Sequence, residues 1–346
     1  MRERSASFGA AAALAACLLL PAAVSAAEPA RPGCGQSTMS GTFYQPLARH
    51  LDWDPHRWAE IDNALQELGM SEIFVQWSAA DGIAFFPTAA RAQLARSPLE
   101  PLFDIATRHG IGVWVGLELD QAFLPVLRKP AVEVQAHLAI RERQLAAILP
   151  DLAAYLRRQE AMAGWYISAE LDDGAWIDSA VAGIVRTHLK RLSFMLKSAL
   201  DRPVAISTFA NGTASPERLA AFWRDIGQGA DIDLLLFQDG VGAGKLTPAQ
   251  SALYAERLAM AMQAEGRQFG VIVEQFGEPA PGAASKEPVF SVAPAARVRQ
   301  QLDAIAGFAQ IRRVAFTLFD YILPEQGERP LLGALLEDRL ACPPDP

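Results

Sequence analysis

Two glutamates, Glu170 and Glu274, each end a short apolar run, and these runs are the fourth and the seventh of eight along the chain. In a barrel of eight parallel strands, catalytic side chains gather at the carboxyl ends of the strands. Two carboxyl groups there can hydrolyse a glycosidic bond, because one protonates the leaving oxygen while the other acts on the opposite side of the anomeric carbon. The two glutamates therefore predict an O-glycosyl hydrolase.

The dimensions of such a barrel give an estimate of the distance between the two carboxyl groups. Strands about 4.8 Å apart, tilted by roughly 36° in a ring of eight, give a radius of about 7–8 Å. The fourth and seventh strands then lie about 14 Å apart, and two inward glutamates that each reach about 4–5 Å leave roughly 5 Å between their carboxyl groups. That distance predicts a retaining mechanism, because an inverting one needs about 6.5–9.5 Å.

The elements that must position these glutamates follow from hydrophobic periodicity. Runs of β-branched, aromatic and apolar residues alternate with longer helical patterns, which is typical of strand–helix units around a parallel sheet. The runs are 41–45, 72–77, 112–118, 164–170, 204–211, 232–239, 269–274 and 314–321. Their starts are spaced by about 30 to 50 residues, which fits a single (β/α)8 TIM barrel. An open doubly wound sheet is the alternative, but it predicts a glycine-rich phosphate loop after the first run, where Tyr44-Gln45-Pro46-Leu47 stands.

Helix starts are marked by a capping residue followed by proline, which costs no hydrogen bond in the first turn. The pairs are Asp54-Pro55, Ser97-Pro98, Ser215-Pro216 and Thr247-Pro248. The longest helical pattern covers 131–160, and its predicted buried stripe consists of Ile140, Leu145, Ile148, Leu149, Leu152 and Leu156.

Side chains of a barrel strand alternate between the interior and the helix-facing layer. If both glutamates point inward, the residues that share their face are Tyr166, Ser168, Gly270 and Ile272. Those expected on the outer face are Trp165, Ile167, Ala169, Val271 and Val273. Both patterns are compatible with a packed barrel.

Other side chains near the strand ends are candidates for binding a sugar. The polar ones are Gln76, Glu118, Asp172, Asn211, Gln238, Asp239 and Asp320. The aromatic ones, whose rings could stack on a sugar face, are Tyr44, Trp77, Trp176, Phe276 and Tyr321. Trp77 and Trp176 are the favoured stacking rings, whereas Phe276 fits barrel packing equally well. Glu278 lies close enough to Glu274 in sequence to be the working residue in its place.

Four segments resemble an exported bacterial family of TIM-barrel proteins known as a domain of unknown function: GTFYQ at 41–45, IFVQW at 73–77, GWYISAELD at 164–172 and FQDGVG at 237–242. The resemblance extends over nearly the whole mature chain. The positions of the two glutamates also resemble those of the clan A glycoside hydrolases, which implies that Glu170 is the acid/base and Glu274 the nucleophile.

One residue departs from the clan A pattern. Those enzymes usually have an asparagine that binds the sugar 2-hydroxyl directly before the acid/base, whereas this chain has Ala169. Gln76 and Asn211 are the candidates to make that contact. Ala169 also keeps open a second function, a carbohydrate-binding barrel that has lost catalysis.

Several other chemistries are disfavoured. The five histidines neither end strands nor pair at metal spacing, and none of the eight runs contains a lysine for a Schiff base, so no metal and no cofactor are expected. The glycine-rich segment 240–244 lacks a basic neighbour and is expected to be a mobile loop over the site rather than a phosphate cradle. The net charge of −8, without a basic patch, argues against nucleic acid as a partner. The sequence does not indicate an oligomeric state.

The first 26 residues have the pattern of an export signal. Arg2 and Arg4 precede an apolar stretch that is too short to span a bilayer, and Val24-Ser25-Ala26 is a small-residue cleavage site. The protein is therefore expected in the periplasm or outside the cell, with a transmembrane segment absent from the mature chain. The alternative is a lipoprotein attached through Cys17, although the residues after Cys17 stay apolar.

The predicted organisation is a signal peptide at 1–26, an N-terminal extension at 27–39, the barrel at 40–341 and a tail at 342–346. Cleavage of the signal leaves Cys34 and Cys342, and an even pair in an oxidising compartment predicts a disulfide. Such a bond would close a loop of roughly 300 residues and add on the order of 4–5 kcal/mol, or less if strained. Two unpaired thiols are the alternative.

Overall fold

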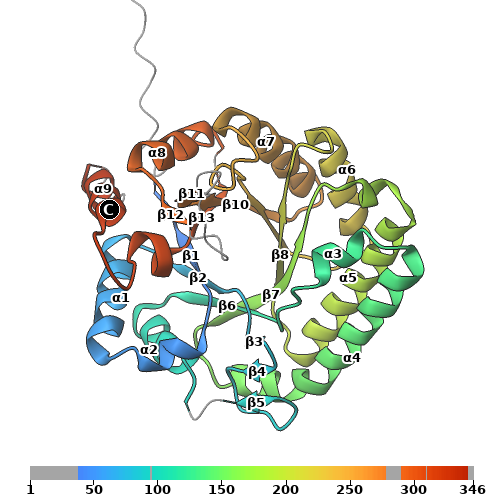
Figure 1. Ribbon diagram of the computed structural model, residues 1–346, viewed down its shortest axis with the longest axis horizontal. Coiled ribbons are helices and arrows are strands. Elements are labelled where there is room, and N and C mark those ends of the chain that lie inside the picture. Colours follow the sequence, from blue (N-terminus) through green and yellow to red (C-terminus); the bar gives the residue numbers. More distant parts are fainter. Residues whose placement is uncertain (1–37, 94–95, 278–289, 309, 342–346) are drawn as a thin grey trace, which may run out of the picture. The chain divides into compact units, whose positions relative to one another are not determined.

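The computed structural model describes residues 38–93, 96–277, 290–308 and 310–341. Within these residues, eight parallel strands close into a barrel, and helices surround it (Figure 1). The strands follow one another around the ring in chain order, and the last pairs with the first. The predicted TIM barrel is confirmed, and closure of the sheet excludes the doubly wound alternative.

Each of the eight predicted runs overlaps one barrel strand. They are β1 (Gly41–Tyr44), β2 (Glu72–Val75), β6 (Gly112–Gly116), β7 (Met162–Leu171), β8 (Val204–Phe209), β9 (Leu234–Gln238), β10 (Gln268–Glu274) and β13 (Arg312–Phe316). Glu170 and Glu274 thus lie on the fourth and seventh strands of the ring. Short strands lie outside it: β3 (Ala79–Ala80), β4 (Ile83–Ala84) and β5 (Ala92–Gln93) form one sheet, and β11 (Phe276–Gly277) pairs with β12 (Ser291–Val292).

The eighth strand is shorter than predicted. It was expected to reach Tyr321, but it ends at Phe316 and is followed by the π-helical turn η4 (Leu318–Ile322). The Thr317 hydroxyl accepts the Asp320 N–H at 3.0 Å, and this local bond favours a turn over continued strand pairing. Asp320 and Tyr321 therefore lie on a helical turn beyond the strand.

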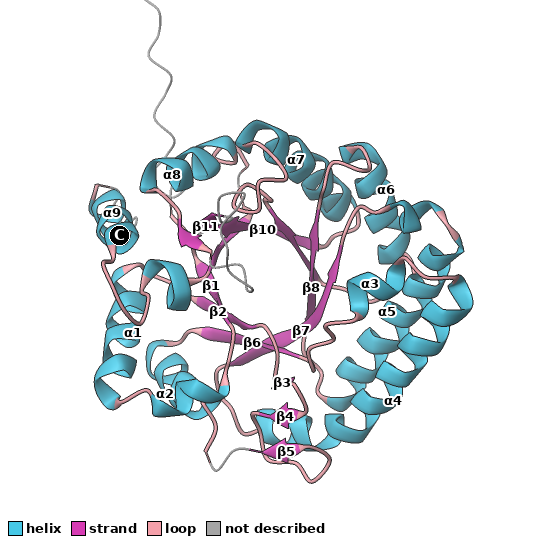
Figure 2. Cartoon of the chain, in the orientation of Figure 1, coloured by secondary structure: helices cyan, strands magenta, loops and turns pink. Residues whose placement is uncertain are grey.

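The helices lie outside the ring of strands (Figure 2). They are α1 (Pro55–Glu67), α2 (Leu99–His109), α3 (Phe123–Leu127), α4 (Ala131–Leu156), α5 (Ala180–Ala199), α6 (Pro216–Gly227), α7 (Pro248–Ala264), α8 (Ala295–Ala304) and α9 (Pro330–Leu340), with short 3-10 turns η2 (Ala48–Asp52) and η3 (Ala175–Asp178). The side chains of Asp54, Ser215 and Thr247 accept N–H groups at the starts of α1, α6 and α7. Such caps typically contribute about 1 kcal/mol each. The capping prediction is confirmed there.

The predicted stripe of α4 is largely buried, but Ile140 was assigned wrongly. Its side chain is 45% exposed, whereas Leu145, Ile148 and Leu152 are buried.

In the described part of the chain, no helix is long and apolar enough to cross a bilayer.

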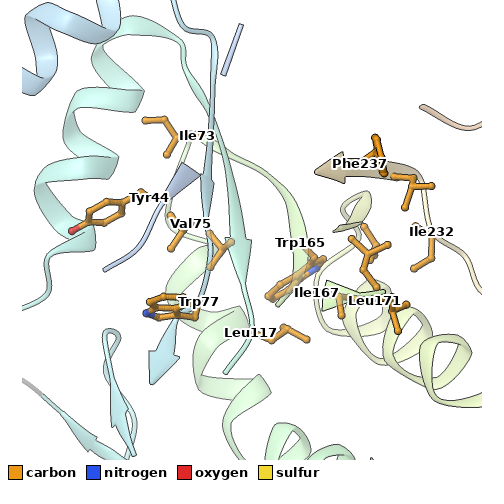
Figure 3. Close-up of a cluster of buried hydrophobic side chains, with 14 of the residues drawn as sticks. Tyr44, Ile73, Val75, Trp77, Leu117, Trp165, Ile167, Leu171, Ile232 and Phe237 are labelled. Carbon is orange, nitrogen blue, oxygen red and sulfur yellow. The ribbon is translucent and has the colours of Figure 1, made fainter. Parts of the chain in front are cut away.

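Two apolar layers form the core. The barrel interior is filled by Phe43, Phe74, Trp114, Tyr166, Ala205, Leu234, Leu236, Ile272 and Val314. The layer between strands and helices contains Trp165, Ile167, Val271 and Val273, and Figure 3 shows part of it. The alternation predicted for the fourth and seventh strands is therefore confirmed at these positions.

Aromatic rings close the barrel below its carboxyl-end mouth. The Phe43 ring stacks on Phe74 at 5.3 Å between centroids, and Phe74 stacks on Trp114 at 5.5 Å. Such pairs contribute about 0.5–1.5 kcal/mol beyond the burial of their area. Gly164 makes room for the last ring, because a Cβ there would lie 2.3 Å from Trp114. The mouth therefore has a solid floor, and the polar side chains above it can be held away from bulk water.

Candidate active site

A layer of amides and carboxyls lies directly above the aromatic floor. Gln45, Gln76, Gln238 and Glu274 each follow, by two residues, a side chain of the barrel interior, namely Phe43, Phe74, Leu236 and Ile272. Glu170 reaches the same layer from the end of β7. The strand ends thus bring both glutamates and three glutamines to one mouth. Gln45 was missed in the sequence, although its distance from the inward Phe43 was a usable signal.

Glu170 is positioned by an irregularity in β7. Ile167 pairs with Ile206 and Glu170 with Ser207, so Ser168 and Ala169 have no partner in β8. Bulges of this kind re-aim side chains and are frequent next to active sites. The Ser168 hydroxyl donates to the Gln76 carbonyl at 2.6 Å and anchors the irregular segment to β2.

Amide side chains surround the Glu170 carboxyl. Gln76 Nε2 donates to its Oε1 at 3.1 Å, and Gln45 Nε2 donates to Gln76 Oε1 at 2.6 Å. Loss of solvent raises the pKa of Glu170, while a hydrogen bond from the Gln238 side chain lowers it. The net upward direction is the one that a general acid requires.

Glu274 is more enclosed. Its side chain is 3% exposed, and the Ala243 N–H donates to its Oε2 at 2.8 Å. Burial, and then the neighbouring Asp239 carboxylate, raise the pKa of Glu274 to about 8, against the opposing effects of the Ala243 and Gly242 N–H groups and of Arg297. Burial and the like charge of Asp239 both favour the protonated form of Glu274 in the unliganded protein.

The turn above Glu274 belongs to the glycine-rich segment 240–244. A Cβ on Gly242 would lie 2.9 Å from Glu274 Oε2 and 2.5 Å from the Phe276 carbonyl oxygen. Only glycine allows the backbone to approach the carboxyl this closely. The segment thus contacts the site through its peptide N–H groups.

Asp239 lies behind Glu274 and is 3% exposed. Its Oδ2 accepts from Gln301 Nε2 at 2.6 Å, and its Oδ1 accepts the Val241 N–H at 3.1 Å. A hydrogen bond from the Glu274 backbone reaches the same carboxyl, whose pKa burial raises to about 6. The structure therefore places this predicted sugar-binding residue against protein donors.

Three more predicted sugar-binding residues contact one another. Asp172 Oδ1 accepts the Trp176 indole N–H at 2.6 Å, and its Oδ2 accepts from Asn211 Nδ2 at 3.4 Å and Arg128 Nη2 at 2.7 Å. Asp172 and Trp176 are 1% and 5% exposed. Their mutual bonds brace the segments that follow β7 and β8.

Asp173, which was not singled out in the sequence, completes this bracing. It is fully buried and accepts the backbone N–H groups of Asn211, Thr213 and Ala214 at 2.7, 2.8 and 3.0 Å. Three N–H donors point at this carboxyl and satisfy the hydrogen-bonding capacity of a buried polar group. Its sequence signal was its place directly after Asp172 at a strand end.

Glu118 is held by two arginines. Its carboxylate accepts a hydrogen bond from Arg91 Nε at 2.8 Å and lies 3.6 Å from Arg141 Nη2. A small cavity of about 50 Å³ beside it is also lined by Ala169. Ala169 packs against the outer core, so the residue before Glu170 faces the helices.

The predicted stacking rings differ in their exposure. Tyr44 is fully buried and bonds His50 Nδ1 at 3.0 Å, and Trp77 is 8% exposed and donates to the Pro46 carbonyl at 2.9 Å. Figure 3 shows both rings within the packed wall. Tyr321 remains half-buried beyond the eighth strand, where burial raises its pKa to about 12, and Asp320 accepts the Thr317 hydroxyl at 2.7 Å.

A group of half-buried aromatic rings lies near Glu274. Phe276 has its centroid 5.6 Å from Tyr321 and 6.0 Å from Phe316. Phe316 was missed because the eighth strand was predicted to continue past it, although it follows the inward Val314 by two residues. We call Phe276, Phe316 and Tyr321 the aromatic rim.

A cavity of about 530 Å³ lies away from the mouth, between α1 and α2. Trp53 and Trp58 line it, but the Trp53 ring is stacked on His50 at 3.9 Å and lies under the Arg57 guanidinium at 5.2 Å. Neither Glu170 nor Glu274 lines this cavity. Among the described residues, no group of three His, Cys, Asp or Glu side chains could hold a metal ion.

Three predicted residues cannot be placed. Glu278, Cys34 and Cys342 lie outside the residues that the structure describes. The disulfide and the alternative role of Glu278 therefore stay predictions.

With the geometry of the mouth established, comparison with known proteins identifies the family. Residues 39–328 match the family described as "Domain of unknown function (DUF4434)". The chain belongs to this family. It is also 27% identical over 239 residues to the "Uncharacterized protein YbcH" of Escherichia coli K12, which covers 69% of this chain and 77% of that protein. The predicted family resemblance is confirmed.

Solved structures similar to this DUF4434 barrel are glycoside hydrolase folds. A "putative alpha-L-fucosidase" from Bacteroides thetaiotaomicron superposes with a TM-score of 0.70 at 16% identity, over 90% of this chain and 98% of that one. An endo-beta-1,4-mannanase from Thermotoga petrophila has a TM-score of 0.54 at 12% identity, over 88% and 76%. GH26C from Muricauda sp. also has a TM-score of 0.54 at 12% identity, over 89% and 87%. At these identities the likeness shows a glycoside hydrolase-like fold.

Proposed function

We propose that this protein is a retaining glycoside hydrolase that acts on an extracytoplasmic polysaccharide or oligosaccharide. One observation carries the proposal: Glu170 and Glu274 lie at the carboxyl ends of the fourth and seventh strands of the ring, on the inner side of a mouth with a solid aromatic floor. Cleavage of a glycosidic bond requires a pair of carboxyl groups that flank it.

The two glutamates have different roles in the proposed reaction. Glu170 donates its proton to the glycosidic oxygen while the Glu274 carboxylate attacks the anomeric carbon, so the carbon–oxygen bond breaks and a glycosyl ester forms. Water then attacks the same carbon, Glu170 takes the proton of that water, and the ester bond to Glu274 breaks. The anomeric configuration is retained after two displacements.

The pKa of Glu274 sets a condition on this reaction. The nucleophile must be ionised, yet its pKa is about 8 in the unliganded protein. We therefore expect kcat/KM to rise with pH through about 8, as long as Glu170 remains protonated. The upward pKa shift of Glu170 supports that second requirement.

The amide side chains beside Glu170 are proposed to replace the missing asparagine. Asn211 is bonded to Asp172, whereas the Gln76 and Gln238 amides both contact Glu170. We assign sugar-hydroxyl binding to these two glutamines and stacking to the aromatic rim. The similarity to a putative alpha-L-fucosidase and to an endo-beta-1,4-mannanase supports a carbohydrate as the substrate class.

Covalent trapping tests the proposal. A panel of activated 2-fluoro-glycosides should add one glycosyl mass to the intact protein, and peptide mapping should place it on Glu274. The Glu274→Gln variant is the matched negative control, because it keeps the size of the side chain. Glu170→Gln should still be trapped by sugars with activated leaving groups, since these need no proton donor.

A carbohydrate-binding barrel without catalysis is the second candidate function. Ala169 and the enclosed Glu274, whose pKa is raised by burial, favour it. The protein could bind an oligosaccharide without forming an adduct or turning it over, and Glu170→Gln could leave this binding unchanged. That result would establish this alternative and refute the enzyme proposal.

We also propose that the protein is exported to the periplasm or beyond, by the signal in residues 1–26. Cell fractionation and N-terminal sequencing of the mature protein test this. A new terminus directly after Ala26 would support cleavage, whereas a lipidated Cys17 would make the protein a lipoprotein. Intact mass before and after reduction would reveal a bond between Cys34 and Cys342.

A further inference from the structure

The peptide groups of Glu274 are held from outside the barrel. Gln301, on α8, donates through Nε2 to the Glu274 carbonyl oxygen at 3.1 Å and to Asp239 Oδ2 at 2.6 Å. Asp239 in turn accepts a backbone hydrogen bond from Glu274. Arg297, one helical turn before Gln301, donates to the same carbonyl at 2.9 Å. Both sides of the Glu274 backbone therefore have partners in one buried cluster.

Asp239 and Gln301 act without touching a ligand in the mouth. Each is 3% exposed. Gln238 belongs to the inner layer, so the next residue, Asp239, points toward the helices by the alternation of strand side chains. Gln301 comes from a helix outside the ring. The pair reaches the mouth through its contacts with the Glu274 backbone and with the turn that follows Asp239.

The same cluster also fixes the Glu274 side chain. Asp239 Oδ1 accepts the Val241 N–H at 3.1 Å, and two residues later the Ala243 N–H donates to Glu274 Oε2 at 2.8 Å. Gly240 has a φ of +67°, which starts the turn in a conformation that favours glycine. Asp239 therefore links the backbone of Glu274 to the turn that holds its carboxyl.

We propose that Asp239 and Gln301 are positioning residues that hold the Glu274 carboxyl for attack on the anomeric carbon. This role rests on the proposed glycosidase function. Holding the attacking oxygen in place reduces the entropy that the reaction must lose, and a misplacement of about 1 Å can cost on the order of 100-fold in rate.

Charge gives Asp239 a second influence on Glu274. The charged and titratable groups that act on Glu274 or are acted on by it are Asp239 at the end of β9, Arg297 on α8 and the Tyr321 phenol on η4. Of these, Asp239 adds like charge and raises the pKa of Glu274, whereas Arg297 lowers it. Removing the charge of Asp239 should therefore ease the ionisation of Glu274.

The variant Asp239→Asn separates positioning from packing, because it keeps the shape but removes the charge and places an NH₂ group among N–H donors. We expect the rate of adduct formation at its pH optimum to fall about 10–100-fold. The acid limb of kcat/KM should move to lower pH by about one unit. Gln301→Ala removes both Nε2 bonds and should lower kcat more than it changes KM, without that shift of the acid limb.

Asp173→Asn is the matched control. Asp173 is also a buried aspartate that accepts N–H groups, from Asn211, Thr213 and Ala214, but it does not contact Glu274 in the described structure. It should lower the melting temperature as Asp239→Asn does, while the pH profile stays unchanged. Equal shifts of the acid limb in both variants would overturn the proposal.

A titration without substrate distinguishes failure of this inference from failure of the glycosidase proposal. Carbon-13 NMR of labelled glutamate carboxyls, assigned with Glu274→Gln, should show a lower midpoint for Glu274 in Asp239→Asn than in the wild-type protein. An unchanged midpoint in a folded variant contradicts the influence of Asp239. The Glu274 carboxyl could titrate at a lower pH in Asp239→Asn while no glycoside labels the wild-type protein. This result would establish the influence of Asp239 on Glu274 and refute the glycosidase function. If Asp239→Asn does not fold, an unaltered kcat in folded Gln301→Ala overturns the positioning role.

Discussion

Glu170 and Glu274 occupy equivalent ends of two barrel strands but are held in opposite ways. Glu170 is contacted by side-chain amides of Gln76 and Gln238, which can turn toward a ligand. Glu274 is contacted by backbone N–H groups and backed by the buried Asp239. Side-chain amides allow a carboxyl to change partner during a reaction, whereas a backbone turn keeps it in one place. The first environment suits a group that gives and takes a proton, and the second suits a group that attacks.

Removing each carboxyl in turn is the strongest test of this comparison. Glu274→Gln should abolish covalent trapping and reduce turnover by about 10⁴-fold or more, because Glu274 is the carboxylate that forms the ester in the proposed reaction. Glu170→Gln should cost about 10²–10⁴-fold on unactivated glycosides and much less on those with good leaving groups. Kinetics on paired substrates measure both. Equal losses for both leaving groups in Glu170→Gln would contradict the division of roles.

The backbone contact to Glu274 is tested by Gly242→Ala. Its Cβ would lie 2.9 Å from Glu274 Oε2, so the turn must move and we expect a loss on the order of 100-fold in kcat. Gly244→Ala is the control, because a Cβ there meets nothing within 4 Å. Its φ of +64° should cost about 1–2 kcal/mol of stability without moving the contact to Glu274. Similar activity in the two variants would show that the turn does not hold Glu274.

The side-chain contact to Glu170 is tested by Gln238→Leu. The bond from Gln238 lowers the pKa of Glu170, so its removal should raise that pKa. Since Glu170 acts in its protonated form, the basic limb of kcat/KM should move to higher pH, with roughly a tenfold loss in kcat/KM. Gln45→Leu, which removes a partner of Gln76 only, should leave the basic limb nearly in place. A shift toward lower pH in Gln238→Leu would contradict this assignment.

The smallest expected effect is on stability. Because the pKa of Glu274 is raised from 4.5 to about 8 in the folded state, the folded protein binds more protons than the unfolded chain between these values. The free energy of unfolding should therefore fall as pH rises through this window, by up to a few kcal/mol. Glu274→Gln should flatten the decline in urea unfolding measured from pH 5 to 8. If the free energy of unfolding of that variant falls with pH as steeply as that of the wild-type protein, other titratable groups cause the decline.

The strands and most helix starts could be predicted because their signals are local. Apolar runs with alternating faces, and Ser, Thr or Asp before proline, depend on neighbours a few residues away. Glu170 and Glu274 could be placed by counting those runs. Tyr166 and Ile272 were placed inside the barrel for the same reason, since alternation is a property of the strand itself.

The surroundings of the glutamates could not be predicted in this way. Three of the predicted residues lie near strand ends but form hydrogen bonds with one another, namely Asp172, Trp176 and Asn211. Glu118 forms ion pairs with two arginines. Phe316 could be assigned to the mouth only from the structure, which shows that the eighth strand ends at this residue. Which polar groups stay free for a ligand depends on hydrogen bonds between residues far apart in the chain, and these have no periodic signal.

The sequence by itself determined that eight strand–helix units form, that they belong to one barrel, and that two glutamates end the fourth and seventh strands. Each of these follows from spacing and side-chain type along the chain. Only the tertiary structure decided that Glu274 is enclosed beside Asp239, which raises its pKa, while Glu170 lies among amides. The reason is that ionisation depends on loss of solvent and on nearby charge, and Asp239 and Arg297 come near Glu274 only when the barrel closes.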